Sequence, residues 1–188
     1  MKYLIKVTNF IKKYKNEEVI IKDLLVTKRI TFLLGKNGSG KSTILKAIGG
    51  FIKFEGDIDI NGKVAYMSEF PSFPIDLTVN EFIFSLNKIS ENKIEEKEIV
   101  NLYKLFNINR KTDHLLSSLS KGMKAKVNLV QVLIENSEIY LLDEPINGLD
   151  KDGVKCLINY LEKSHKNFVI STHLLDDFKN LKGEVINL

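Results

Sequence analysis

Gly35-Lys36-Asn37-Gly38-Ser39-Gly40-Lys41-Ser42 matches the pattern G-x-x-x-x-G-K-[ST] at every fixed position, and it organises the rest of the chain around it. The apolar run 30–34 before it reads as a buried strand, and residues 43–48 after it read as the start of a helix. Its glycines allow backbone conformations that a Cβ forbids, so N–H groups can approach phosphate oxygens where the helix begins. The sequence therefore predicts a binding loop for a nucleoside triphosphate.

Each residue of this loop has a predicted role. The Lys41 ammonium reaches the β- and γ-phosphates, and the Ser42 hydroxyl holds Mg²⁺. We assign the contacts of the nucleotide to Gly35, Lys36, Asn37, Gly38, Ser39, Gly40, Lys41, Ser42 and Thr43.

Composition limits the class of protein. The 188 residues suffice for one large domain or two tightly joined lobes with a buried core. The net charge of +4 is mild, and only Arg29 and Arg110 among the 28 basic residues are arginine, which argues against a dedicated nucleic-acid surface. The single cysteine, Cys156, fits a reducing compartment. No apolar run approaches 18 residues, so we expect no membrane span in this sequence.

The hydrophobic pattern changes character along the chain. It predicts strands at 3–7, 19–21, 30–34, 54–60, 64–67, 139–142, 168–171 and 184–187. Asn61-Gly62 is a strong signal for a β-hairpin between two of these strands. The pattern is helical from Thr78, which has Glu81 as its capping partner, to about residue 118. A second helix within this block begins in the charged stretch 91–98. Further helices are expected at 127–134 and 154–161.

This order of elements predicts the fold class. Strands that alternate with helices on both sides of residue 75 indicate an α/β core with a mainly parallel sheet. The helical block 75–118 interrupts that core. We therefore expect one domain, 1–188, in which 1–74 and 119–188 form the core and 75–118 is an inserted helical subdomain.

Two acids end the apolar run 139–142. Ligands bind at the carboxyl ends of strands in open α/β folds, so Asp143 can hold Mg²⁺ through water and Glu144 can orient or deprotonate an attacking water. Because many strands end in acids, this pair alone is a weak signal for a metal or catalytic site. It becomes a strong signal together with the phosphate loop about 100 residues upstream. His173 follows another strand and could place an imidazole beside a terminal phosphate, although a lone histidine is more often structural.

The segment Leu119-Ser120-Lys121-Gly122-Met123 opens a helix. Ser120 is a good N-cap, and Gly122 permits close backbone approach to an anion. Taken alone, the segment reads as a plain capping sequence.

In this order and spacing, the motifs resemble the nucleotide-binding subunit of an ABC transporter along essentially the whole chain. The resemblance implies a P-loop NTPase core, an N-terminal antiparallel β-subdomain and the inserted helical subdomain. It implies that Ser120 and Gly122 bind the ATP of a second subunit, in a head-to-tail dimer around two ATP molecules. Asp150 then belongs to a loop that crosses the dimer interface, and His173 is the switch histidine. Tyr14 matches an aromatic residue that stacks on adenine; a surface tyrosine is the alternative.

Three positions depart from the family pattern. Glu69 replaces a glutamine that contacts Mg²⁺ and the attacking water, on a loop that faces the membrane partner. A glutamate can still ligate Mg²⁺, but it adds negative charge beside the phosphates. Met123 and Ile146 replace a glutamine and a threonine, with little expected consequence.

We therefore expect an ATPase that powers a separate integral-membrane permease, with export favoured over import. The expected partners are that permease and a second ATP-binding subunit, in a homodimer, and no nucleic acid. The expected location is the cytoplasm, peripheral on the inner face of the cell membrane through the permease. The rival readings are a soluble ABC ATPase acting in DNA repair or translation, a non-hydrolysing ATP-binding regulatory module and, less favoured, an unrelated P-loop kinase.

Overall fold

A parallel sheet forms the centre of the computed structural model, which describes residues 3–15 and 17–188. Its strands are β3 (Ile30–Leu34), β5 (Val64–Met67), β6 (Ile139–Asp143), β7 (Asn167–Thr172) and β8 (Glu184–Asn187). Their spatial order is β5-β6-β7-β3-β8, and every neighbouring pair is parallel. The three central strands are almost entirely buried, as expected for a parallel sheet covered on both faces.

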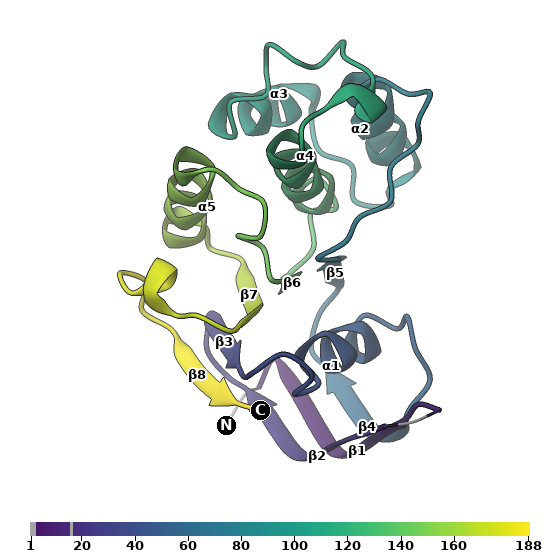
Figure 1. Ribbon diagram of the computed structural model, residues 1–188, viewed down its shortest axis with the longest axis vertical. Coiled ribbons are helices and arrows are strands. Elements are labelled where there is room, and N and C mark those ends of the chain that lie inside the picture. The colour runs from purple at the N-terminus through teal and green to yellow at the C-terminus, as the bar shows by residue number, and fades with distance from the viewer. Residues whose placement is uncertain (1–2, 16) are drawn as a thin grey trace.

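A smaller antiparallel sheet contains β1 (Ile5–Lys13), β2 (Glu18–Val26) and β4 (Glu55–Ile60), in the order β2-β1-β4. It lies with α1 (Lys41–Ile48) toward the lower end of the molecule in Figure 1, below β5, β6 and β7. Together the two sheets and the helices confirm the predicted fold class, including the mainly parallel core and the N-terminal antiparallel sheet.

The predicted hairpin at Asn61-Gly62 is wrong. Strand β4 pairs with β1 in the antiparallel sheet, whereas β5 pairs with β6 in the parallel sheet. The turn therefore carries the chain from one sheet to the other. Gly62 has a φ of 132°, a conformation that a residue with a side chain rarely adopts, so this glycine serves the crossing.

Four further helices lie on the other side of the parallel sheet: α2 (Val79–Ile89), α3 (Glu96–Leu105), α4 (Lys121–Leu133) and α5 (Lys151–Lys163), with short 3₁₀ turns at Leu116–Ser118 and Asp176–Phe178. Helices α2, α3 and α4 gather at the end opposite the antiparallel sheet (Figure 1). The predicted capping box of Thr78 and Glu81 is present. The second helix starts later than expected because Glu95 and Glu98 form a capping box of their own, so residues 91–95 stay outside it.

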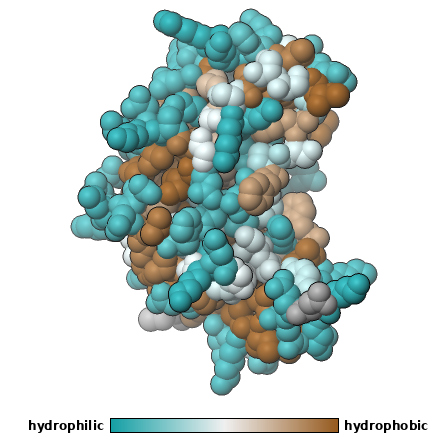
Figure 2. All heavy atoms as spheres, in the orientation of Figure 1, coloured by the Kyte–Doolittle hydropathy of each residue, from teal (hydrophilic) through white to brown (hydrophobic). Residues whose placement is uncertain are grey.

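The parallel sheet separates two hydrophobic cores. Alternate residues of β6 face opposite sides: Tyr140 and Leu142 join the core under α2 to α5, while Ile139 and Leu141 join the core with α1 and the antiparallel sheet. The sheet is thus packed on both faces, and this packing holds in place the residues that follow each strand at its carboxyl edge. Figure 2 shows a mostly hydrophilic face with several separate apolar patches. Within residues 3–15 and 17–188, no helix combines the length and apolar character needed to cross a bilayer.

Candidate active site

The carboxyl edge of the parallel sheet opens into a cavity of about 290 Å³. It is lined by the loop residues Asn37, Gly38, Gly40, Lys41, Ser42 and Thr43, by Glu69, Glu144, Asn147 and His173, and by Glu17 and Val19. The structure therefore brings most of the phosphate loop together with Glu69, Glu144 and His173, three residues that sequence reasoning placed at one site.

The phosphate loop leaves backbone donors free at the start of α1. Gly38 and Gly40 adopt left-handed conformations, with φ of 85° and 95°. Gly40 is the N-cap of α1, and no side chain caps this helix. The first N–H groups of a helix lack intrahelical partners, and the helix dipole makes that end positive. The cavity wall is therefore suited to a phosphate group.

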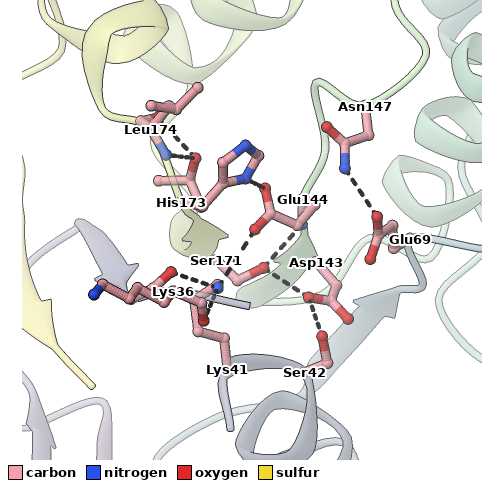
Figure 3. A network of polar contacts seen from close by, with 12 residues as sticks. Lys36, Lys41, Ser42, Glu69, Asp143, Glu144, Asn147, Ser171, His173 and Leu174 are labelled. Carbon is pink, nitrogen blue, oxygen red and sulfur yellow. Dashed lines mark hydrogen bonds and ion pairs between the residues drawn. The ribbon is translucent and has the colours of Figure 1, made fainter. Parts of the chain in front are cut away.

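Lys41 lies buried beneath this loop. Its Nζ donates to the carbonyl oxygens of Gly35 at 2.7 Å and Lys36 at 3.2 Å, and it lies 3.6 Å from Glu144 Oε1 (Figure 3). Lys41 and Glu144 are only 6 % exposed, so each charge is balanced by the other in a site that largely excludes water.

Asp143 is held by three hydroxyl groups. Its Oδ1 accepts hydrogen bonds from Ser42 Oγ at 2.9 Å and Ser171 Oγ at 2.7 Å, and its Oδ2 accepts one from Tyr66 at 3.2 Å. Burial raises the pKa of the Tyr66 phenol, and the negative charge of Asp143 raises it further, so Tyr66 stays a donor. Sequence analysis assigned no role to Tyr66 or Ser171, although each lies two or three residues before a predicted site residue, Glu69 or His173.

Glu144 sits at a strained turn directly after β6. Its φ is 45°, which is uncommon for a residue with a side chain. Its N–H donates to Ser171 Oγ at 2.8 Å, and its Oε2 lies 3.1 Å from His173 Nδ1. The turn points the carboxylate into the cavity between Lys41 and the imidazole (Figure 3).

The donor set fits a hard divalent cation. Ser42 Oγ and the Asp143 carboxylate are oxygen ligands within 2.9 Å of each other. Mg²⁺ usually binds one or two carboxylates together with substrate phosphates and water, so a dedicated protein cage is not required. Among the described residues, indeed, no three His, Cys, Asp or Glu side chains are grouped to hold a metal. Glu69, also predicted as a ligand, accepts a hydrogen bond from Asn147 Nδ2 at 2.9 Å at the cavity wall.

Ser120, Gly122 and Asp150 are not among the residues lining this cavity. Ser120 caps α4 by accepting from Met123 N at 3.3 Å. A Cβ at Gly122 would lie 3.2 Å from the Gly148 carbonyl oxygen, so the glycine allows α4 to approach the loop after β6 closely.

Asp150 caps α5 and pairs with a buried cation. It accepts from Lys126 Nζ at 3.0 Å and from Gly153 N at 2.7 Å. The hydrogen bond from Lys126, followed by that from Gly153, holds the pKa of the carboxyl below its ordinary value. In this arrangement both Asp150 oxygens are used within the chain.

Tyr14 lies at the other side of the phosphate loop. Its hydroxyl is 3.2 Å from Thr43 Oγ1, and the side chain is 41 % exposed. The Lys12 ammonium lies 5.5 Å from the ring centroid. A half-exposed ring beside the helix that carries the phosphate loop leaves a face available to a nucleotide base.

Comparison with known proteins agrees with this geometry. The family described as ABC transporter matches residues 24–147. An uncharacterized ABC transporter ATP-binding protein of Methanocaldococcus jannaschii, MJ1023, is 32 % identical over 196 residues, which cover 100 % of this chain and 75 % of that protein. The bacitracin transport ATP-binding protein BcrA of Bacillus licheniformis is 29 % identical, over 98 % of this chain and 66 % of its own length. A solved ATP-binding subunit of an ABC transporter superposes with a TM-score of 0.84 at 26 % identity, covering 98 % of this chain and 85 % of that one.

Proposed function

The chain belongs to the ABC transporter family as an ATP-binding ATPase, and from this premise we propose that it dimerises around two ATP molecules and powers a separate membrane permease. The observation that carries the proposal is the contact of buried Glu144 with buried Lys41 on one side and with the more exposed His173 on the other, beside the phosphate loop. We also propose the division of the chain into a core of 1–74 and 119–188 and an inserted helical subdomain of 75–118.

In the proposed reaction, water attacks the γ-phosphorus of ATP, the bond to the bridging oxygen breaks, and ADP and phosphate leave. Glu144 orients the water and accepts its proton, while His173 holds the Glu144 carboxylate through Oε2. Lys41 binds the phosphates. Ser42 and Asp143 would hold Mg²⁺, which neutralises phosphate charge when bound. Tyr14 stacks on the base.

The second half of each ATP site comes, in this proposal, from another copy of the chain. The start of α4 carries Ser120 and Gly122, outside the cavity of their own chain. The positive end of a helix suits a phosphate group. Asp150, on the adjoining loop, lies at the same interface. Because one sequence carries both halves, a homodimer needs no further chain.

The proposed permease docks on exposed apolar side chains near the loop that follows β5. Phe51 and Phe70 line one surface groove and are 65 % and 81 % exposed. Large apolar groups exposed together are typical of protein contact sites. The permease would place the protein on the cytoplasmic face of the membrane, with transport in the export direction. Glu69 and the segment Ser120-Lys121-Gly122-Met123 resemble the corresponding positions of exporters in this family, which supports that direction.

Dimer formation is tested with the variant Glu144→Gln, which keeps the side-chain shape but removes the proton acceptor. With ATP and Mg²⁺ it should bind nucleotide and run as a dimer in light scattering. Lys41→Ala is the matched control and should stay monomeric. A Glu144→Gln chain that binds ATP as a monomer would contradict the dimer mechanism.

The partner is tested by affinity purification of the tagged chain from gently solubilised native membranes, with mass spectrometry of what accompanies it. A stoichiometric membrane protein of several spans is the expected result. Ribosomal or nucleic-acid partners without a membrane protein would instead favour a role in translation or DNA repair.

A further inference from the structure

Tyr66 contacts both Asp143 and an aromatic side chain at the protein surface. It lies in β5, and its hydroxyl donates to Asp143 Oδ2 at 3.2 Å. Its ring packs on that of Phe51, with centroids 5.1 Å apart and a tilt of 46°. One side chain therefore touches both the acid proposed to hold Mg²⁺ and an aromatic ring that is 65 % exposed on the surface.

The surface in question is an apolar groove of about 420 Å³. Phe51, Tyr66, Phe70 and Pro71 line it, beside α4. None of its lining residues also lines the nucleotide cavity. A neighbouring cavity shares Phe70 and Pro71 with the groove and Glu69 and Glu144 with the nucleotide site, so the two lie close together. The Tyr66 hydroxyl provides the direct contact from the groove to Asp143.

The hydrogen bonds of Asp143 show why this contact matters. Oδ1 has two donors, Ser42 and Ser171. Oδ2 receives a hydrogen bond from Tyr66 alone among the described residues. The last torsion of an aspartate is broad and soft, so bonds to one oxygen leave the plane of the carboxylate free to rock. A donor on the second oxygen fixes that plane.

We propose that Tyr66 is a positioning residue that fixes the orientation of Asp143, and that the packing of Phe51 in the groove holds Tyr66 in place. A change in the packing of Phe51 moves the Tyr66 ring and so alters Asp143. This role rests on the proposed function in one respect, the assignment of Mg²⁺ to Ser42 and Asp143.

Tyr66→Phe tests the first half of the proposal, because it keeps the ring and the groove and removes only the hydroxyl. The dissociation constant of ATP is measured by calorimetry with and without Mg²⁺, in the Glu144→Gln background, so that no turnover interferes. Without Mg²⁺ the dissociation constant should stay within about twofold. With Mg²⁺ it should rise about fivefold, which corresponds to about 1 kcal/mol and lies in the range of one ordinary hydrogen bond. The matched control is Tyr103→Phe, which removes a hydroxyl bonded to Asn80 at 3.4 Å and should change neither constant.

Phe51→Ala tests the second half through a double-mutant cycle. As a single substitution, Phe51→Ala should raise the dissociation constant of ATP measured with Mg²⁺ about threefold. In the Tyr66→Phe background it should cause no further increase, because the effect of Phe51 on Asp143 depends on the Tyr66 hydroxyl. The control Ile89→Ala removes another side chain that is 78 % exposed and should have no effect. An unchanged constant in Tyr66→Phe, or additive effects in the cycle, would overturn the proposal. The measurement uses the isolated chain, so failure of the permease proposal would leave its outcome unaffected.

Discussion

Ser171→Ala is the substitution that most directly probes how the two acids are held. The Ser171 side chain is completely buried. Its hydroxyl donates to Asp143 Oδ1 at 2.7 Å and accepts from the Glu144 N–H at 2.8 Å. Alanine fits the same space, so the change removes two hydrogen bonds and leaves the packing nearly intact.

The expected loss of stability follows from these two bonds. An unpaired buried N–H costs about 1–3 kcal/mol, and a lost bond to a charged carboxylate that keeps other donors adds about 1 kcal/mol. The sum is about 3 kcal/mol, which for a chain of this size lowers Tm by about 6–12 °C. Activity should fall as well, because the Glu144 turn has a φ of 45° and depends on its surroundings to persist. We expect kcat to drop at least about tenfold, with the KM for ATP changed much less.

Thr172→Val is the matched control. Thr172 is also fully buried, and its hydroxyl makes two bonds, to the Leu174 carbonyl at 2.8 Å and from the Leu174 N–H at 3.1 Å. Neither bond touches an acid. Calorimetric unfolding and steady-state ATPase assays of both variants should show a lower Tm in each but a lower kcat in Ser171→Ala alone. Equal losses of kcat in the two variants, or a Ser171→Ala enzyme with wild-type Tm and kcat, would refute the reasoning.

Three further predictions use other contacts of the site. Glu69→Gln should keep ATPase turnover within about tenfold, because the amide oxygen still accepts from Asn147; a larger loss in a steady-state assay would show a specific role for the carboxylate. Gly40→Ala should abolish tight ATP binding in calorimetry while the chain stays folded, since φ of 95° at the helix start excludes a side chain. Asp150→Asn keeps an N-cap but leaves buried Lys126 without an anion, so urea unfolding at pH 7 should show a loss of about 1 kcal/mol after allowance for solvent screening. The Asp150 pKa is lowered in the fold, so its contribution is full above pH 3.8, and the difference from wild type should vanish as the pH falls through the folded pKa.

Local sequence predicted the parallel core well. Strands β3, β5 and β8 have the predicted bounds, and the Thr78 capping box starts α2 where expected. These features depend on neighbours in the chain, because a buried parallel strand is a short apolar run and a capping box spans four residues. The hairpin at Asn61-Gly62 failed because its two strands found partners far away in the sequence, which no local pattern encodes.

The same distinction explains which site residues the sequence could reveal. Lys41, Asp143 and Glu144 lie in sequence motifs whose chemistry can be predicted without a structure. Ser171 is set beside Asp143 by the register of β7 against β6, which pairs these two positions. Tyr66 reaches Asp143 from β5, on the other side of β6. The contacts of Ser171 and Tyr66 with Asp143 depend on the order of strands in the sheet, and the local sequences of β5 and β7 do not determine that order.

The contacts of Lys41 define what ATP must change when it enters. An ammonium group has three donors. In this structure Lys41 Nζ is bonded to Gly35 O and Lys36 O, and its third neighbour is Glu144 Oε1 at 3.6 Å. A phosphate group that takes a donor from Lys41 must therefore displace one of the three, and the longest contact is the weakest. Release of Oε1 frees the Glu144 oxygen that the proposed mechanism needs for water, while Oε2 stays on His173. Binding of the phosphates by Lys41 and loosening of its contact with the proton acceptor are thus coupled.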